Sequence, residues 1–415
     1  MTEAAPAVPA PGGFAAYWTL LRLPQAARLL TAALLGRAQF GMASLAILLL
    51  VHGETGSFAD AGVAVGVFGG FGAVLMPVLG RVVDRVGQVP VLAACGAAQS
   101  AGFLALALAA RHGASLGLLI ALAAVTGACL PPVASSMRAL WPVLTPDPTL
   151  REAAYTLDAI SQELIWTVGP LTVGVLVAVA SASLALVVCA ALTAFGITLY
   201  VTSPVPRSVR PAHRHPSWIG ALASRQIQAL VGCLAIGWIG MGICQVGIPA
   251  IAVRAGSPAS AGVLLAMWAV GSLIGGIGFG AIQWRSSIAT RYAVLYVLLA
   301  VLCVPLVFAR SIPVAIVCVL CAGLPLAPLI GCQYSLVSAA APAGTATEAF
   351  AWTAAAAFGA ASAGSAIGGW LIKQNGLTWA FAAALVPMAA AAVLAIASVG
   401  GLRAGARIQP PAATS

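Results

Sequence analysis

The chain has 415 residues, of which 61% are hydrophobic and 7% are charged. Soluble domains carry about 25% charged residues, and the mean hydropathy of this chain is +1.05. These values exclude a single soluble domain, a nucleic-acid-binding protein and a disulfide-stapled secreted module. We interpret the net charge of +10 as topogenic charge in membrane loops, not as a phosphate-binding patch.

Continuous apolar runs of about 20 residues, the length that spans a hydrocarbon core of about 30 Å, recur along the whole chain. A β-barrel is disfavoured, because its strands would alternate polar and apolar residues. The predicted helical spans, in chain order, are 28–51, 61–80, 89–110, 115–137, 155–178, 181–202, 227–250, 261–283, 292–309, 312–334, 348–371 and 378–400.

The basic residues orient these spans. With both termini in the cytoplasm, fourteen basic residues lie on the cytoplasmic side and four lie on the other side, namely Arg111, Arg254, Arg310 and Lys373. Cytoplasmic loops of membrane proteins carry such an excess of Lys and Arg. The sequence therefore predicts a multi-pass protein of the plasma (inner) membrane with cytoplasmic termini.

The two halves of the chain resemble each other. Residues 56–63 and 256–263 match at six of eight positions, and the offset of 200 also relates Gly80 to Gly280. Farther along, an offset of 196 relates Thr149 and Glu152 to Thr345 and Glu348. We interpret this as a duplication of six spans. It predicts an N-terminal six-helix bundle (1–202), a cytoplasmic linker (203–225) and a C-terminal six-helix bundle (226–415).

The matched Thr-x-x-Glu pairs have the spacing of capping boxes. In a capping box the Thr hydroxyl and the Glu carboxylate satisfy free backbone N–H groups at a helix start. The sequence therefore predicts that Thr149 with Glu152 and Thr345 with Glu348 begin spans 5 and 11.

A short turn follows span 2, where residues 80–89 read GRVVDRVGQV. This stretch resembles the signature that joins spans 2 and 3 in the major facilitator superfamily. Gly80, Asp84, Arg85 and Gly87 occupy the signature positions, whereas its final basic pair is replaced by Gln88 and Val89. The resemblance extends to the twelve spans, the basic central loop and the twofold repeat. It implies an all-α membrane protein whose twelve transmembrane helices form two pseudo-symmetric six-helix bundles.

In that family the turn acts as a conformational latch. The resemblance implies that Asp84 contacts the start of span 11, near Thr345 and Glu348, in one conformational state. The second half carries Trp284 at the position that corresponds to Asp84, so we expect a weaker latch there.

Span 5 carries a second partial resemblance. Gly169, Pro170 and Gly174 are similar to the Gly-Pro motif of drug–proton antiporters, which favours efflux over uptake. The alternative is a proline kink with small residues that serve helix packing.

Three ionisable residues lie inside predicted spans, where a charge costs at least about 2.5–3.5 kcal/mol on insertion scales. Arg37 lies about 13 Å beyond Arg28, at about 1.5 Å per residue. Glu163 is similarly deep, whereas Asp158 is shallower and is expected to be a solvated cytoplasmic acid. Asp158 and Glu163 point in different directions on one helix. Glu163 is either a proton-binding acid tuned by Arg37, a static partner of Arg37, or a contact for a charged substrate.

The antiporter resemblance predicts an arginine within span 4, but the first candidate, Arg138, falls at the predicted cytoplasmic end of that span. Arg37 is the expected substitute. By resemblance, spans 1, 4, 7 and 10 line the transport path. Their polar or aromatic residues, which serve either the cavity or helix packing, are Gln39, Trp238, Gln245, Gln333 and Tyr334.

Together these features predict a secondary active transporter, not an enzyme. We expect proton-coupled efflux of a small hydrophobic or weakly polar molecule by alternating access, without a cofactor or metal, using the proton gradient. The expected partners are the small-molecule substrate and the lipid bilayer, with no nucleic acid, and the protein is expected to act as a monomer. The alternatives are uptake or facilitated diffusion of a small polar solute and, more remotely, a non-transporting membrane sensor.

Overall fold

A computed structural model describes residues 14–23, 25–145, 147–209, 220–257, 260–282 and 284–406. These residues form helices and connecting turns, and no strand occurs among them. The helices of the N-terminal half are α1 (Phe14–Arg22), α2 (Ala26–Arg37), α3 (Gln39–Thr55), α4 (Phe58–Val86), α5 (Gln88–Arg111), α6 (Leu116–Ala128), α7 (Val133–Leu144), α8 (Pro148–Val179), α9 (Ala182–Val201) and α10 (Pro204–Ser208). Those of the C-terminal half are η1 (Gly220–Ala223), α11 (Arg225–Arg254), α12 (Ser260–Ala281), α13 (Ile288–Cys303), η2 (Val304–Phe308), α14 (Ile312–Gly323), α15 (Leu326–Ala340), α16 (Ala346–Asn375) and α17 (Leu377–Ala406).

Twelve segments of the described chain are long and apolar enough to cross a membrane, and they correspond one by one to the predicted spans. Several extend past the predicted ends; the second, for example, is Asp60–Val86 instead of 61–80. Its last turn stays helical despite Arg81, Asp84 and Arg85, because Arg81 and Asp84 have partners on another helix.

Spans 4 and 10 are each broken into two helices. The first break lies between α6 and α7 at Pro131 and Pro132, and the second lies between α14 and α15 at Pro325. Proline lacks a backbone N–H and clashes with the preceding turn, so a helix bends or stops there. Both breaks border the space between the two halves, because Pro131 and Leu326 line the same cavity.

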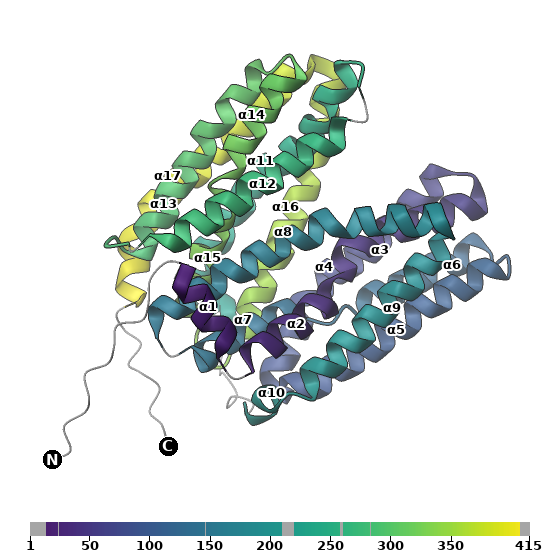
Figure 1. Ribbon diagram of the computed structural model, residues 1–415, viewed down its shortest axis with the longest axis horizontal. Helices are drawn as coiled ribbons and strands as arrows, with labels where there is room; N and C mark the ends of the chain where they lie inside the picture. The colour runs from purple at the N-terminus through teal and green to yellow at the C-terminus, as the bar shows by residue number, and fades with distance from the viewer. Residues whose placement is uncertain are drawn as a thin grey trace.

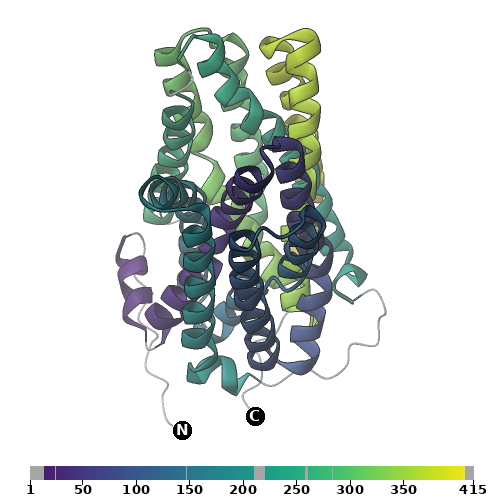
Figure 2. The same cartoon turned by 90° about the vertical axis from the view of Figure 1, so that its right-hand side faces the viewer.

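The helices form two groups. In Figure 1, α2–α10 (purple to teal) make one bundle and α11–α17 (green to yellow) make the other, and the bundles diverge from the region of α7 and α15. The turned view shows the green-to-yellow helices mostly above the purple-to-teal ones (Figure 2). Helix α16 crosses between them to pack on α4 and α7, and α8 packs on α12 and α15.

The limits 203–225 of the predicted linker stay a prediction, since residues 210–219 lie outside the described chain.

Helix α1, which the sequence interpretation missed because it is too short to span a bilayer, joins the two bundles. It packs on α2 and α8 of one bundle and on α12 of the other. The hydroxyl of Tyr17 donates a hydrogen bond to the Gly276 carbonyl at 3.2 Å, and its ring occupies the place that a Cβ at Gly280 would fill. Burial raises the pKa of Tyr17 to about 12, so its hydroxyl stays a donor at neutral pH.

Candidate functional site

Asp84 joins the end of α4 to the start of α16. Its Oδ1 accepts the Thr347 backbone N–H at 3.1 Å, and its Oδ2 accepts the Glu348 N–H at 2.8 Å. These N–H groups have no partner inside the helix, and the helix dipole favours an anion beside them. Gly80 permits this approach, because a Cβ there would meet Ala351 at 2.9 Å. The contact that the resemblance implied is therefore present.

The predicted capping box at Thr345 and Glu348 is wrong. The Thr345 side chain does not cap α16; its hydroxyl donates to the Pro342 carbonyl instead. The Glu348 carboxylate accepts two hydrogen bonds from Arg81 of α4, at 2.6 and 3.1 Å. The other bundle thus supplies both the cap of α16 and the partner of its first acid.

The capping box at Thr149 and Glu152 is also wrong. Helix α8 already begins at Pro148, and Asp147 caps it by accepting the Leu150 N–H at 3.0 Å; the side chain of Thr149 lies outside the described part of the structure. The Glu152 carboxylate instead accepts hydrogen bonds from Arg291 of α13 at 2.7 and 3.0 Å. A second bidentate ion pair therefore crosses between the bundles.

These two acids hold the bundles together at one end of the molecule, which we call the latch end. Each comes from the first turns of a pseudo-equivalent helix, and each pairs with an arginine of the opposite bundle. Trp284, at the position equivalent to Asp84, turns back on its own bundle and donates to the Phe279 carbonyl. Arg85 is exposed, and Gly87 ends α4 with a φ of 102°, which favours glycine.

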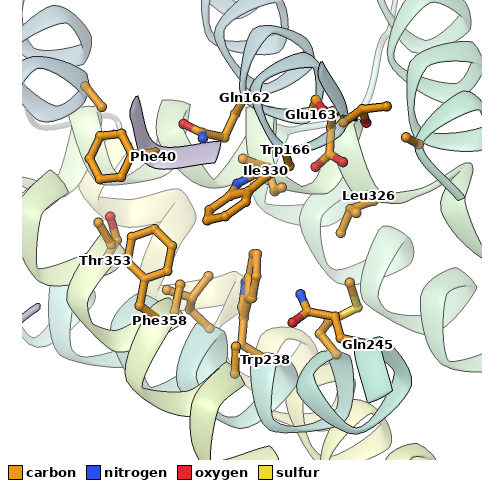
Figure 3. Close-up of a pocket in the computed structure, with 18 of the residues that line it drawn as sticks. Phe40, Gln162, Glu163, Trp166, Trp238, Gln245, Leu326, Ile330, Thr353 and Phe358 are labelled. Carbon is orange, nitrogen blue, oxygen red and sulfur yellow. Dashed lines mark hydrogen bonds between the residues drawn. The ribbon is translucent and has the colours of Figure 1, made fainter. Parts of the chain in front are cut away.

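A cavity of about 950 Å³ lies between the bundles. Its wall runs from Arg138 and Tyr334 to Gly262, near the start of α12, so it extends away from the latch end. Figure 3 shows Gln162, Glu163 and Trp166 of α8 facing Trp238 and Gln245 of α11 across it, with Phe40 and Phe358 at one side. Of the described residues on the wall, Arg138 and Glu163 carry charge. Its other polar groups are mainly amides and hydroxyls.

Four predicted cavity residues, Trp238, Gln245, Gln333 and Tyr334, line this space. Gln39 does not line it: it is fully buried, and its amide atoms have no hydrogen-bond partner among the described residues. The wall also includes large aromatic side chains that the interpretation did not single out. These are Phe40, Trp166, Trp268 and Phe358.

The static Arg37–Glu163 pair, one of the alternatives left open for Glu163, is wrong, and so is the expected exposure of Asp158. Asp158 is fully buried and lies between two arginines. Arg37 Nη1 lies 2.7 Å from Asp158 Oδ1, and Arg138 Nε donates to Asp158 Oδ2 at 2.7 Å. We call Arg37, Arg138 and Asp158 the buried trio. Three helices of one bundle, α2, α7 and α8, contribute one residue each.

Arg138 also corrects the expectation that span 4 has no internal arginine. Its side chain is 4% exposed, and its guanidinium lies 3.9 Å from the centre of the Tyr334 ring. The span continues to Leu144, because α7 resumes after the proline break, so Arg138 lies inside it. The sequence contained this residue, but the predicted span ended at residue 137, one position before Arg138, whereas the observed span ends at Leu144.

Glu163 stands apart from the trio. It lies five residues after Asp158 on α8, and its carboxylate projects into the cavity (Figure 3). No hydrogen bond or ion pair joins that carboxylate to another residue of the described chain. Unlike Asp158, Glu163 therefore has no charged partner in the described chain.

A comparison with protein families decides the identity of the fold. The sequence model of the Major Facilitator Superfamily matches residues 29–365. The chain belongs to the major facilitator superfamily. As a member of this superfamily it is an integral multi-pass membrane transporter, not an enzyme.

Solved structures of superfamily transporters share this fold. The human organic anion transporter MFSD10 (TETRAN) is 16% identical with a TM-score of 0.70, and a bacterial homologue of the iron transporter ferroportin, in an outward-facing state, is 16% identical with a TM-score of 0.76. A bacterial homologue of the iron transporter ferroportin in an outward-facing state with soaked iron is 17% identical with a TM-score of 0.74. Each similarity covers 89% of this chain and 98% of the other. No curated protein gives a significant sequence match.

In this superfamily member the span 5 motif has separable roles. A Cβ at Gly169 would lie 2.6 Å from the Gly41 backbone, so Gly169 lets α8 and α3 pack closely. Pro170 lines the cavity. A Cβ at Gly174 would meet no neighbouring atom within 4 Å, and nothing in the structure explains the glycine there.

Proposed function

We propose that the protein couples the proton gradient to the export of a small, largely apolar molecule by alternating access. The observation that carries this proposal is Glu163, an acid on the wall of a cavity between two bundles whose carboxylate has no partner in the described part of the chain. Cavities at the interface of such repeats hold the substrate in transporters of this architecture. Aromatic and aliphatic side chains dominate the wall, which suits a largely apolar substrate.

Glu163 suits a proton site for electrostatic reasons. An ionised carboxylate without a partner is costly in an apolar cavity, and protonation removes that cost. When the cavity admits water, the ionised form regains favourable contacts. Opening and closing of the cavity would thus change the proton affinity of Glu163, which is the requirement for coupling.

The latch end explains how the cavity can open to one side of the membrane at a time. If it faces the cytoplasm, as the distribution of basic residues predicts, the latch closes the cytoplasmic side while the cavity extends toward the outside. Rocking of one bundle on the other would break the Asp84 cap and the two ion pairs, and would open the cavity inward. The Gly-Pro resemblance in span 5 favours export.

The proposal is tested in proteoliposomes with the pH dye pyranine inside, an acidic lumen, and the membrane potential clamped with K⁺ and valinomycin. Naphthalene-2-sulfonamide and naphthalene-2-sulfonate serve as uncharged and anionic aromatic probes. Antiport predicts that external probe makes the lumen more alkaline, whereas the alternative of uptake with protons predicts acidification.

Two variants locate the proton site. Glu163→Gln should abolish the response, whereas Glu54→Gln, which neutralises an exposed acid at the end of α3, should retain it. An unchanged response in Glu163→Gln would refute the proton role of this residue. Absence of any response of the wild type to both probes would refute the proposed transport.

A further inference from the structure

We propose that the cavity contains a subsite for one anionic group, carboxylate or sulfonate in type, of an otherwise aromatic substrate, and that Arg138 binds it. This inference rests on the proposed function, because it takes the cavity as the substrate site. It narrows the substrate class from small apolar molecules to amphipathic monoanions.

The first argument is the unused hydrogen-bonding capacity of Arg138. Its side chain is 96% buried, yet it lines the cavity. Nε donates to Asp158, and no other hydrogen bond joins the guanidinium to the described chain. Tyr334 covers one face of the group. The two terminal nitrogens are not among the buried atoms that lack a partner, so they border the open space of the cavity.

The second argument is charge. The buried trio contains two arginines and one aspartate, which leaves one positive charge in excess. Arg37 alone suffices to neutralise Asp158, since it is fully buried at 2.7 Å from that carboxylate. A buried charge is costly unless an opposite charge accompanies it, and Glu163 forms no ion pair with the trio. An anion in the cavity would supply the missing charge.

The third argument is geometry. Arginine presents parallel N–H donors that match the two oxygens of a carboxylate or sulfonate. The face of the guanidinium is taken by Tyr334, so a ligand approaches its edge. Beyond Arg138 the wall offers Trp166, Trp238 and Phe358, whose rings pack against a planar body. A second negative group on the ligand would lie near the Glu163 carboxylate and be repelled by it when that carboxylate is ionised. A ligand with a single anionic group therefore fits best.

The test compares the binding of naphthalene-2-sulfonate and naphthalene-2-sulfonamide to purified protein by isothermal titration calorimetry. The two probes share a ring system and differ in charge. A hydrogen-bonded charge at Arg138 predicts that the sulfonate binds about 10- to 100-fold more tightly. Equal affinity of the two probes for the wild type would overturn the subsite.

Two arginine variants separate contact from charge. Arg138→Gln removes the donor from the wall and leaves the neutral Arg37–Asp158 pair, so it should abolish the preference for sulfonate and leave sulfonamide binding in place. Arg37→Gln removes the same charge but no cavity donor, because Arg37 is not on the wall, so it should reduce the preference for sulfonate only in part. Equal losses in both variants would overturn direct binding by Arg138.

A measurement on the wild type covers the case in which Arg138→Gln does not fold. Phenylglyoxal modifies arginines, and mass spectrometry locates the adducts. Sulfonate should protect Arg138 at concentrations where sulfonamide does not, and equal protection by both probes would overturn the proposal. If both probes bind equally and the proton gradient drives their transport, the anionic subsite is refuted while the proposed function stands. If neither probe binds, both the subsite and the proposed function are refuted.

Discussion

Replacement of Asp84 by Asn tests the latch with the smallest possible change. The side chain keeps its size, but it loses its charge and presents an NH₂ group to one of the two backbone N–H donors of α16. The Asp84 contacts at 3.1 and 2.8 Å therefore cannot both persist. The variant should destabilise the state closed at the latch end relative to the state open there.

The expected size follows from these contacts. Hydrogen bonds to charged groups contribute about 1.5–3 kcal/mol, and the asparagine side chain can still accept one of the two N–H groups. Asp84 is half-buried, and it gains water when the latch opens, which offsets part of the loss. A difference of about 1.5 kcal/mol corresponds to a change of about tenfold in the population ratio.

Double electron–electron resonance measures that ratio. Spin labels at Val86 and Ser286, both exposed and at the latch end of opposite bundles, report the separation of the bundles. The three partly exposed cysteines, Cys95, Cys129 and Cys321, are replaced by serine in the background. Asp84→Asn should increase the population at long distance.

The matched control is Asp60→Asn, which neutralises an acid in the first turn of the same helix, far from the latch. It should give the same distance distribution as the spin-labelled protein that carries neither substitution. An unchanged distribution in Asp84→Asn, or an equal shift in the control, would refute the argument that the cap of α16 holds this end closed.

Three further predictions concern the contacts around the latch and the span 5 packing. Arg291→Gln removes the ion pair with Glu152 and should shift the same distances in the same direction by less, because the Glu152 side chain is 30% exposed and water screens its charge. Gly169→Ala should lower the thermal midpoint of the detergent-solubilised protein by several degrees, whereas Gly174→Ala should not; equal midpoints would contradict the packing argument. Tyr17→Phe removes the hydrogen bond from α1 to α12, which contributes about 1 kcal/mol, and should raise the open population at the latch end; no change would show that α1 does not fasten the bundles.

The twelve spans could be predicted because each is a local property of the sequence, a run of apolar residues of fixed length. The ends of the spans could not. Helix α4 continues through Asp84, and span 4 continues through Arg138, because partners from other helices stabilise these polar turns. Those partners are distant in sequence.

The pairing of charges was the main error. The depth of Arg37 and Glu163 in their spans predicts two charges inside the membrane, and both the proton site and the static pair assumed that Arg37 acts on Glu163. In the structure Asp158 pairs with both arginines, and Arg138 belongs to α7, the helix that begins after the proline break in span 4. The capping boxes failed for a related reason: Asp84 caps α16 from the other bundle, which frees Glu348 for Arg81.

The accumulation of labelled naphthalene-2-sulfonate against its own gradient tests the central claim, that Glu163 couples the proton gradient to transport. In proteoliposomes with an imposed pH gradient and a clamped potential, the wild type should concentrate the probe above equilibrium. Glu163→Gln should only equilibrate it, at a rate that no longer depends on the pH gradient. Accumulation by Glu163→Gln to the wild-type level would contradict the account.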